Sequence, residues 1–313
     1  MFDKLSSFGL SFILRVVVPG IWGLAIFLVG IFPWISQTEI YKNISSLVVN
    51  IGGAVIIVFF IGLLVSLSDD FIYRLYEGRA FWPEKMRDFF VNRLNKKVDK
   101  LYRKAEAKKV NQQERAELWS WLRGFPTDSK GKPIATCPTE MGNILAAYEE
   151  YPDRKYGMDS VFYWYRIWLS IEEEVRKCVD QIWANADCLI YLSFVSIVGA
   201  LLFIILLLVK LSFMILSVSN MALISLPIPF SILTIGIVVL LLTFLIFYRL
   251  SLPSHKINGE YFKSIFDLFR QDIVKIQLKE EPAEEQKKWD RTWSYLQYGK
   301  IAKNSKRGQE VKG

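Results

Sequence analysis

The stretch LIYLSFVSIVGALLFIILLLV, residues 189–209, carries no charged side chain, and two serines and one tyrosine are its only polar groups. A helix of about 20 residues crosses the hydrocarbon core of a bilayer. A helix in a soluble domain rarely stays uncharged over such a length, because one of its faces meets water. The stretch therefore predicts a transmembrane helix.

Three further runs have the same character: residues 16–34, 47–65 and 226–247. Short loops join the first run to the second and the third to the fourth, which predicts two membrane hairpins. Small residues that allow close helix contact occur in the first two runs: Gly20, Gly23, Gly30, Gly52, Gly53 and Gly62. The sequence thus predicts an all-α integral membrane protein with four transmembrane helices and a helical cytosolic domain.

The distribution of basic residues predicts the orientation of the chain. Of 39 Lys and Arg residues, only Lys42 and Lys210 lie in the two short loops that close the hairpins. Positively charged residues concentrate on the cytosolic side of membrane proteins. We therefore expect both termini and the segment between the hairpins to be cytosolic, with the hairpins in a plasma membrane or a bacterial inner membrane.

The chain outside the hairpins is predicted to be mostly helical. The expected organisation is an amphipathic lead-in at 1–15, a hairpin at 16–66, a cytosolic helical segment at 67–187, a hairpin at 188–248, a cytosolic helical tail at 249–303 and a disordered end at 304–313. Proline disfavours helix in the residue before it. Pro152 therefore predicts a turn, and Pro253 and His255 are expected in a linker ahead of an amphipathic helix at 259–279. The segment 68–186 and the tail should pack as one domain.

Residues 85–109 combine an apolar stripe of helical period with ten basic and three acidic residues. The basic side chains beside the stripe are Arg93, Lys97, Lys100, Lys104 and Lys108. Two interpretations stay open: the helix lies on anionic lipid head groups, or its stripe packs inside the domain and its lysines are solvated. Nucleic-acid binding is not favoured, because no motif of a known module accompanies the charge.

The most aromatic segment is NILAAYEEYPDRKYGMDSVFYWYRIWLS, residues 143–170. Gly157 permits a left-handed turn and Asp159 can cap a following helix. On that helix Val161, Tyr165 and Trp168 share a face, so we expect a helix–turn–helix corner with buried rings. Because Tyr, Trp and Arg dominate interfaces, part of the corner is also a candidate docking surface: Tyr148, Tyr151, Arg154, Tyr156, Trp164 and Trp168.

The sequence offers little catalytic chemistry. His255 is the single histidine, so neither a histidine metal cluster nor a convincing serine triad is expected. No phosphate-binding loop motif is present, and we expect neither a metal nor a cofactor. Asp69 and Asp70 form the acidic pair nearest a membrane run, although solvated charge is the simpler interpretation. Asn50 is the polar residue that would line a pore or join two helices by a hydrogen bond.

These features favour a non-enzymatic membrane anchor, scaffold or effector that acts through its helical cytosolic domain. The expected partners are membrane lipids with anionic head groups, further copies of the chain and a cytosolic protein. A homo-oligomeric channel or pore-forming effector is the alternative, because the membrane runs lack the charged groups usual in coupled transporters. A membrane enzyme that acts on lipid through Asp69 and Asp70, or through the acids near Glu149, is a lesser alternative.

Overall fold

The computed structural model describes residues 9–30, 51–107, 110–215, 228–274, 284 and 286–292. These residues are helical apart from short connections and contain no β-strand, although Thr127 and Pro133 form an isolated antiparallel bridge. The chain divides into two compact units, one of residues 1–80 and 180–255 and one of residues 81–179 and 256–313. The predicted lead-in before residue 9 and the predicted disordered end at 304–313 lie outside the described residues.

Three helical segments are long and apolar enough to cross a membrane: Leu10–Gly30, Glu173–Ser212 and Phe230–Arg270. A bent pair, Gly52–Leu67 with Asp69–Glu77, makes a fourth if the pair is one span. The first segment consists of α2 (Leu10–Phe12), the π-helix η1 (Ile13–Val17) and α3 (Val18–Gly30). A helical chain with three to four such segments is compatible with a membrane location, as the sequence predicts.

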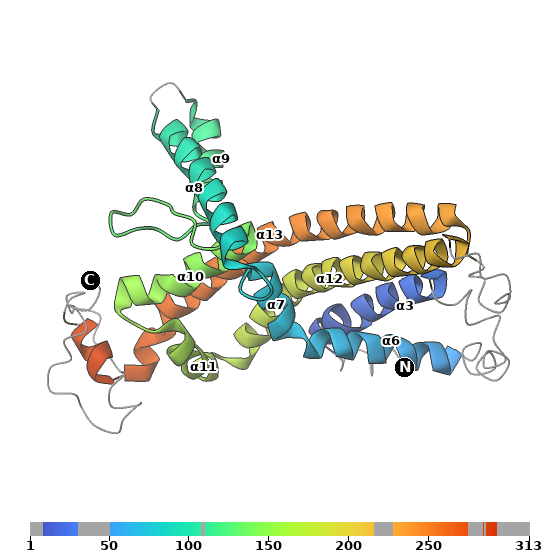
Figure 1. Cartoon of the computed structure of the whole chain (residues 1–313). Coiled ribbons are helices and arrows are strands. Elements are labelled where there is room, and N and C mark those ends of the chain that lie inside the picture. Colours follow the sequence, from blue (N-terminus) through green and yellow to red (C-terminus); the bar gives the residue numbers. More distant parts are fainter. Residues whose placement is uncertain are drawn as a thin grey trace. The chain divides into compact units, whose positions relative to one another are not determined.

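Helices α3 and α6 (Ile51–Leu67) pack closely because glycines lie at their contact (Figure 1). A Cβ added to Gly20 would lie 2.1 Å from the carbonyl oxygen of Val58, and one added to Gly62 would lie 2.0 Å from that of Val16. From Val16 to Gly20 in the first segment, the contact on α6 moves back from Gly62 to Val58. The two segments are therefore antiparallel. Small residues let the two backbones touch, and dispersion and shape complementarity then hold apolar helices together.

A single phenylalanine fixes α3 against two further helices, α12 (Glu173–Ile215) and α13 (Phe230–Val274). The ring of Phe203 on α12 is 2% exposed. A Cβ on Gly30 of α3 or on Gly236 of α13 would each come within 2.4 Å of this ring. Two glycines from two helices therefore leave the space that one large side chain of a third helix fills.

The bend that follows α6 has a local cause at Ser68. Its hydroxyl donates a hydrogen bond to the carbonyl oxygen of Leu64, at 2.8 Å. Such bonds to the carbonyl four residues earlier compete with the helical ladder and bend helices. Helix α7 (Asp69–Glu77) departs from α6 at 54°, and Gly78 ends it in a left-handed conformation.

The prediction of a linker around Pro253 is wrong, because α13 continues through this residue. A proline in a helix removes one backbone hydrogen bond and costs about 3 kcal/mol. Buried residues on both sides of Pro253 offset this cost, since Leu252 is 7% exposed and His255 is 1% exposed. Residues 259–274 of the predicted separate tail helix continue α13, and residues 275–279 lie outside the described residues.

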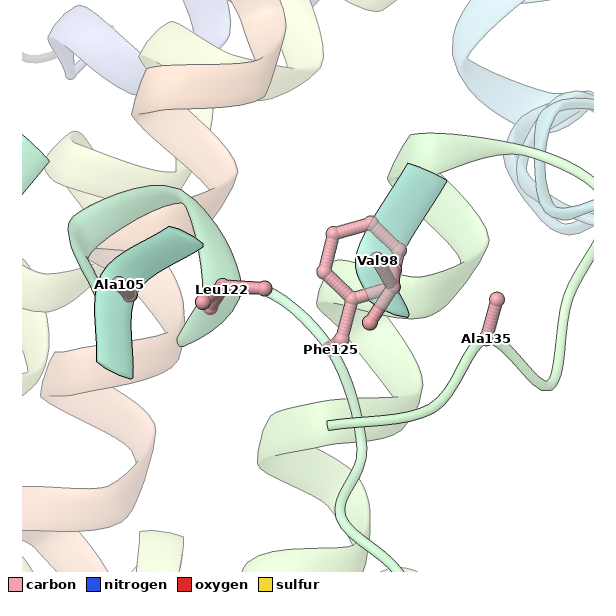
Figure 2. Packing of buried hydrophobic residues seen from close by; sticks show 5 residues of the cluster. All are labelled: Val98, Ala105, Leu122, Phe125 and Ala135. Atoms are coloured by element: carbon pink, nitrogen blue, oxygen red, sulfur yellow. The ribbon is translucent and has the colours of Figure 1, made fainter. Parts of the chain in front are cut away.

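The second unit contains α8 (Glu84–Glu106) and α9 (Gln112–Leu122), which pack against each other. Their shared core is a cluster of buried apolar side chains, shown in Figure 2: Val98, Ala105, Leu122, Phe125 and Ala135. Asn111 begins α9 by accepting a hydrogen bond from the Glu114 amide. Pro83 precedes α8 directly, as expected from its position ahead of the basic stretch.

Helix α10 (Glu140–Tyr156) runs through Pro152, so the predicted turn at that residue is also wrong. Pro152 is buried, and the helix ends instead at Gly157, whose φ is +66°. The Gly157 and Met158 amides donate to the carbonyls of Asp153 and Pro152. These bonds form the glycine cap that commonly ends helices.

The loop before α10 is fixed by one buried side chain, that of Asn143. Its Nδ2 donates to the carbonyls of Cys137 and Thr139, at 2.7 and 2.6 Å. Its Oδ1 accepts from the amides of Thr136 and Cys137, at 2.8 and 3.1 Å. Asn143 thus supplies hydrogen-bond partners for four backbone groups of the loop. Thr139 caps α10 by accepting a hydrogen bond from the Gly142 amide.

The glycine contact between α3 and α6 can be tested with Gly62→Leu. The added side chain has no space against the Val16 backbone, so we expect the variant to lose about 1–3 kcal/mol of stability through overpacking. The measurement is the thermal unfolding midpoint of the chain purified in detergent micelles. Gly52→Leu is the matched control on the same helix, because a Cβ there meets nothing within 4 Å. Equal midpoints for the two variants would contradict the assigned contact.

Candidate functional site: the aromatic corner of the second unit

The rings of the predicted docking surface pack mainly on α13. Trp164 of α11 (Ser160–Ser170) stacks on Phe262 with ring centroids 4.7 Å apart, and Trp168 lies 5.4 Å from Trp164. Tyr148 of α10 is 5.1 Å from the same Phe262 ring. These three predicted docking residues thus form an internal cluster, which contributes the burial energy of large rings. Asp159 caps α11, as predicted, by accepting from the Phe162 amide.

Three polar side chains of the corner bind the carboxylate of Asp267 on α13. The hydroxyl groups of Tyr151 and Tyr156 donate to its carboxylate, at 2.9 and 2.6 Å. The ammonium of Lys155 lies 3.3 Å from one of its oxygens. The guanidinium of Arg270 lies over the Tyr156 ring at 4.1 Å. This carboxylate joins α10 to α13 in a network of charge-assisted hydrogen bonds.

Burial and the bond to Asp267 change how the corner titrates. Burial, followed by the hydrogen bond that its hydroxyl donates to Asp267, raises the pKa of Tyr156 to about 12. Burial also raises the pKa of Tyr151. Since the protonated phenol is the form that donates to a carboxylate, the network is intact at neutral pH. The corner binds protons more tightly when folded than when unfolded.

The largest exposed apolar surface of the corner is a stripe along α11. Val161, Tyr165 and Leu169 are 74%, 71% and 74% exposed, and they recur every four residues. The prediction that Val161 and Tyr165 are buried is therefore wrong. The buried face of α11 is instead that of Tyr163 and Ile167, each 0% exposed. We call Val161, Tyr165 and Leu169 the α11 stripe.

Two of the predicted docking residues differ from the stacked rings. Arg154 is exposed and donates a hydrogen bond to the carbonyl of Thr127, at 3.3 Å. Tyr156 is 7% exposed, and Arg270 lies over its ring. The exposed apolar side chains of this segment are those of the α11 stripe.

The second half of the basic helix α8 packs inside its unit. Leu94, Leu101 and Val98 belong to the core shared with α9. Lys97 lies 4.4 Å from the centre of the Trp121 ring and Lys104 pairs with Glu114 at 2.5 Å. For these turns, packing in the domain is therefore the interpretation that holds.

The other residues of the predicted basic surface do not take part in this packing as Lys97 and Lys104 do. Arg93 and Lys100 are exposed on α8, whereas Lys108 lies outside the described residues. In the first turns of the helix, Met86 and Phe89 are 40% and 62% exposed. This end of α8 is thus both basic and apolar at its surface.

The first unit contains a partly buried charge network around Arg15, in the π-helix η1. Its guanidinium pairs with Asp180 at 2.6 Å and with Asp187 at 2.7 Å, both on α12. The hydroxyl of Tyr73 donates to Asp187 at 2.5 Å. His255 packs edge-to-face on the Tyr73 ring at 5.7 Å. Two carboxylates thus satisfy the cation, and the Tyr73 hydroxyl satisfies one of these carboxylates, so the network ties η1, α7 and α12 together.

Asp69 and Asp70, the first two residues of α7, have different partners. Asp69 accepts a hydrogen bond from the Tyr191 hydroxyl at 2.7 Å. Asp70 is exposed and lies 3.6 Å from Arg74. Asn50, the predicted pore or interhelical residue, lies outside the described residues. No group of three or more metal-ligating side chains occurs in the part of the chain that the structure describes.

The chain matches no protein-family model, no curated protein and no solved structure.

Raising the pH tests the network at Asp267. The pKa of Tyr156 is higher in the folded chain than its ordinary value of 10.0. Its contribution to stability is therefore fully present below about pH 10 and is lost as the pH rises through about 12. We expect the unfolding free energy to decline across this window, and to decline less steeply in Tyr156→Phe. Chemical unfolding followed by tryptophan fluorescence at several pH values gives both slopes, and identical slopes would exclude this assignment.

Proposed function

We propose that the chain is a non-enzymatic membrane scaffold that assembles with a second copy of itself through the α11 stripe. Its apolar helices anchor it in the membrane, and the distribution of Lys and Arg favours a cytosolic location for both termini and for the second unit. The single observation that carries the proposal is the exposure of three large apolar side chains on one face of α11. Contiguous exposed apolar surface commonly marks an interaction site.

The sequence of α11 suits a symmetric contact. Tyr165 lies midway between Val161 and Leu169, so a two-fold axis through Tyr165 brings Val161 of one copy onto Leu169 of the other. Arg166 is the only charged residue within the helix, and the same axis places it near Trp164 of the other copy. An isologous contact of this kind uses the same patch on both copies.

The membrane lowers the cost of this association. Two copies that share one bilayer meet in two dimensions with their second units already near each other, which raises their effective concentration. A short stripe then suffices where a soluble protein would need a larger interface. We therefore expect a weak contact in isolation and a stable one in the membrane.

Other partners and functions predicted from the sequence involve different residues. Contact with anionic head groups is proposed for the first turns of α8, where Met86 and Phe89 are exposed beside Arg93. The channel alternative depends on Asn50, of which the structure describes nothing. The lipid-enzyme alternative would use Asp69 and Asp70 or the acids near Glu149. Asp69 accepts a hydrogen bond from Tyr191, whereas Asp70 forms an ion pair with Arg74.

Tyr165→Glu tests the proposed assembly. A two-fold contact centred on this residue would place two carboxylates together, so we expect the dimer to dissociate at least tenfold more readily, which corresponds to about 1.4 kcal/mol. The measurement is the association of the full chain in lipid vesicles, followed by energy transfer between labelled copies across a series of protein-to-lipid ratios.

Leu268→Glu is the matched control for this experiment. Leu268 is also 71% exposed, but it lies on α13 and outside the stripe. The control should dimerise as the unmodified chain does. A monomeric unmodified chain, or equal weakening in both variants, would reject the self-assembly through α11, and a dimer unaffected by Tyr165→Glu would reject the stripe as its contact.

A further inference from the structure

A basic cavity lies in the second unit where the end of α9, α10 and α13 meet. Its volume is about 270 Å³. The residues that line it come from three stretches of the chain: Ser120, Arg123, Gly124, Ile144, Ala147, Tyr148, Lys256, Ile257, Gly259, Glu260 and Lys263. Three of these side chains are cationic and one is anionic, so the cavity carries an excess of positive charge.

The cations differ in how their charge is balanced. Lys263 pairs with Glu260 at 2.9 Å, which neutralises the one carboxylate of the lining. Within the described residues, neither Arg123 nor Lys256 forms an ion pair. Arg123, directly after α9, and Lys256 of α13 therefore bring two positive charges to a shared cavity. Burial lowers the pKa of Lys256, and the charge of Glu140 opposes this shift.

Glycines shape the walls beside these charges. A Cβ on Gly124 would lie 3.0 Å from Cε of Lys256, so the lysine stem runs across this glycine. A Cβ on Gly259 would lie 2.7 Å from Cδ1 of Tyr148, which places the tyrosine ring against α13. The position of Lys256 is thus set by packing, and Tyr148 supplies a flat apolar wall next to it.

A second cavity of about 170 Å³ continues from the first. The two share Arg123, Ala147 and Lys263, and the second adds Tyr151 and Arg154. Together they form a groove with four cationic side chains and one carboxylate. Three residues of the predicted docking surface, Tyr148, Tyr151 and Arg154, therefore line this groove.

We propose that this groove binds the phosphate groups of an anionic ligand. A phosphate presents several oxygens in different directions, so it can accept hydrogen bonds from a guanidinium and from separate lysines at once. The serine hydroxyl of Ser120 adds a further donor. The apolar wall at Tyr148 and Ile144 suits the organic part of a phosphate ester. The site is distinct from the α11 stripe and does not depend on the proposed self-assembly.

Two sources supply this chemistry, a soluble phosphate compound and a phospholipid head group. The soluble source is tested by isothermal titration of the full chain in detergent with inorganic pyrophosphate. We expect binding that weakens with added salt, because charge supplies most of the affinity. Arg123→Gln and Lys256→Gln should each weaken it at least tenfold. Lys100→Gln is the control, since Lys100 is exposed on α8 and lies outside the groove.

The lipid source is tested by native mass spectrometry of the chain from nanodiscs of phosphatidylcholine with 10% phosphatidic acid, a mixture of about one charged lipid in ten. Retention of phosphatidic acid that Arg123→Gln and Lys256→Gln abolish, and Lys100→Gln does not, would assign the groove to a head group. Binding of pyrophosphate with the same variant pattern would assign it to a soluble ligand. Absence of both, or binding that all three variants change equally, would overturn the proposal. Circular dichroism of each variant checks that it folds.

Discussion

The close approach of apolar helices at glycine is the constraint on which the first unit depends. Lipid tails are as apolar as leucine, so burial alone gives such helices no reason to associate with one another. Gly20 and Gly62 let two backbones touch, and Gly30 and Gly236 leave room for the ring of Phe203. Dispersion then replaces the hydrophobic effect as the main attraction. The polar network at Arg15 adds direction to this packing, because its hydrogen bonds require definite partners on two other helices.

The second unit is organised on different terms. Its core follows the ordinary separation of apolar and polar faces, with α8 and α9 sharing buried residues and α10 and α11 stacking rings on α13. Charge is concentrated at its surface, in the groove and on the first turns of α8. The α11 stripe is apolar and the groove is basic, so this unit has two surfaces of opposite character. We propose that the stripe binds a second copy of the chain and that the groove binds phosphate groups.

The sequence predicts those helix ends that are fixed by hydrogen bonds between neighbouring residues. Thr139, Asp159 and Gly157 cap helices as their residue types suggest, since a cap involves only a few neighbouring residues. The same reasoning failed at Pro152 and Pro253, where packing against distant residues offsets the lost hydrogen bond. It failed again at α11, because a helix that is apolar on both sides has no polar face to reveal which side is buried. The groove escaped prediction for a third reason: Arg123 and Lys256 are far apart in the chain, and no motif links them.

The loop held by Asn143 has a consequence for the order in which the second unit folds. Its hydrogen bonds join residues four to seven positions apart. The bond between the Tyr163 hydroxyl and the Trp289 carbonyl joins residues 126 positions apart. Closing a short loop costs less chain entropy than closing a long one, and contacts of low sequence separation form faster. We therefore expect the hydrogen bonds of Asn143 to form early. The bonds between Asn95 and Ala135, 40 positions apart, and between Tyr163 and Trp289 should form later.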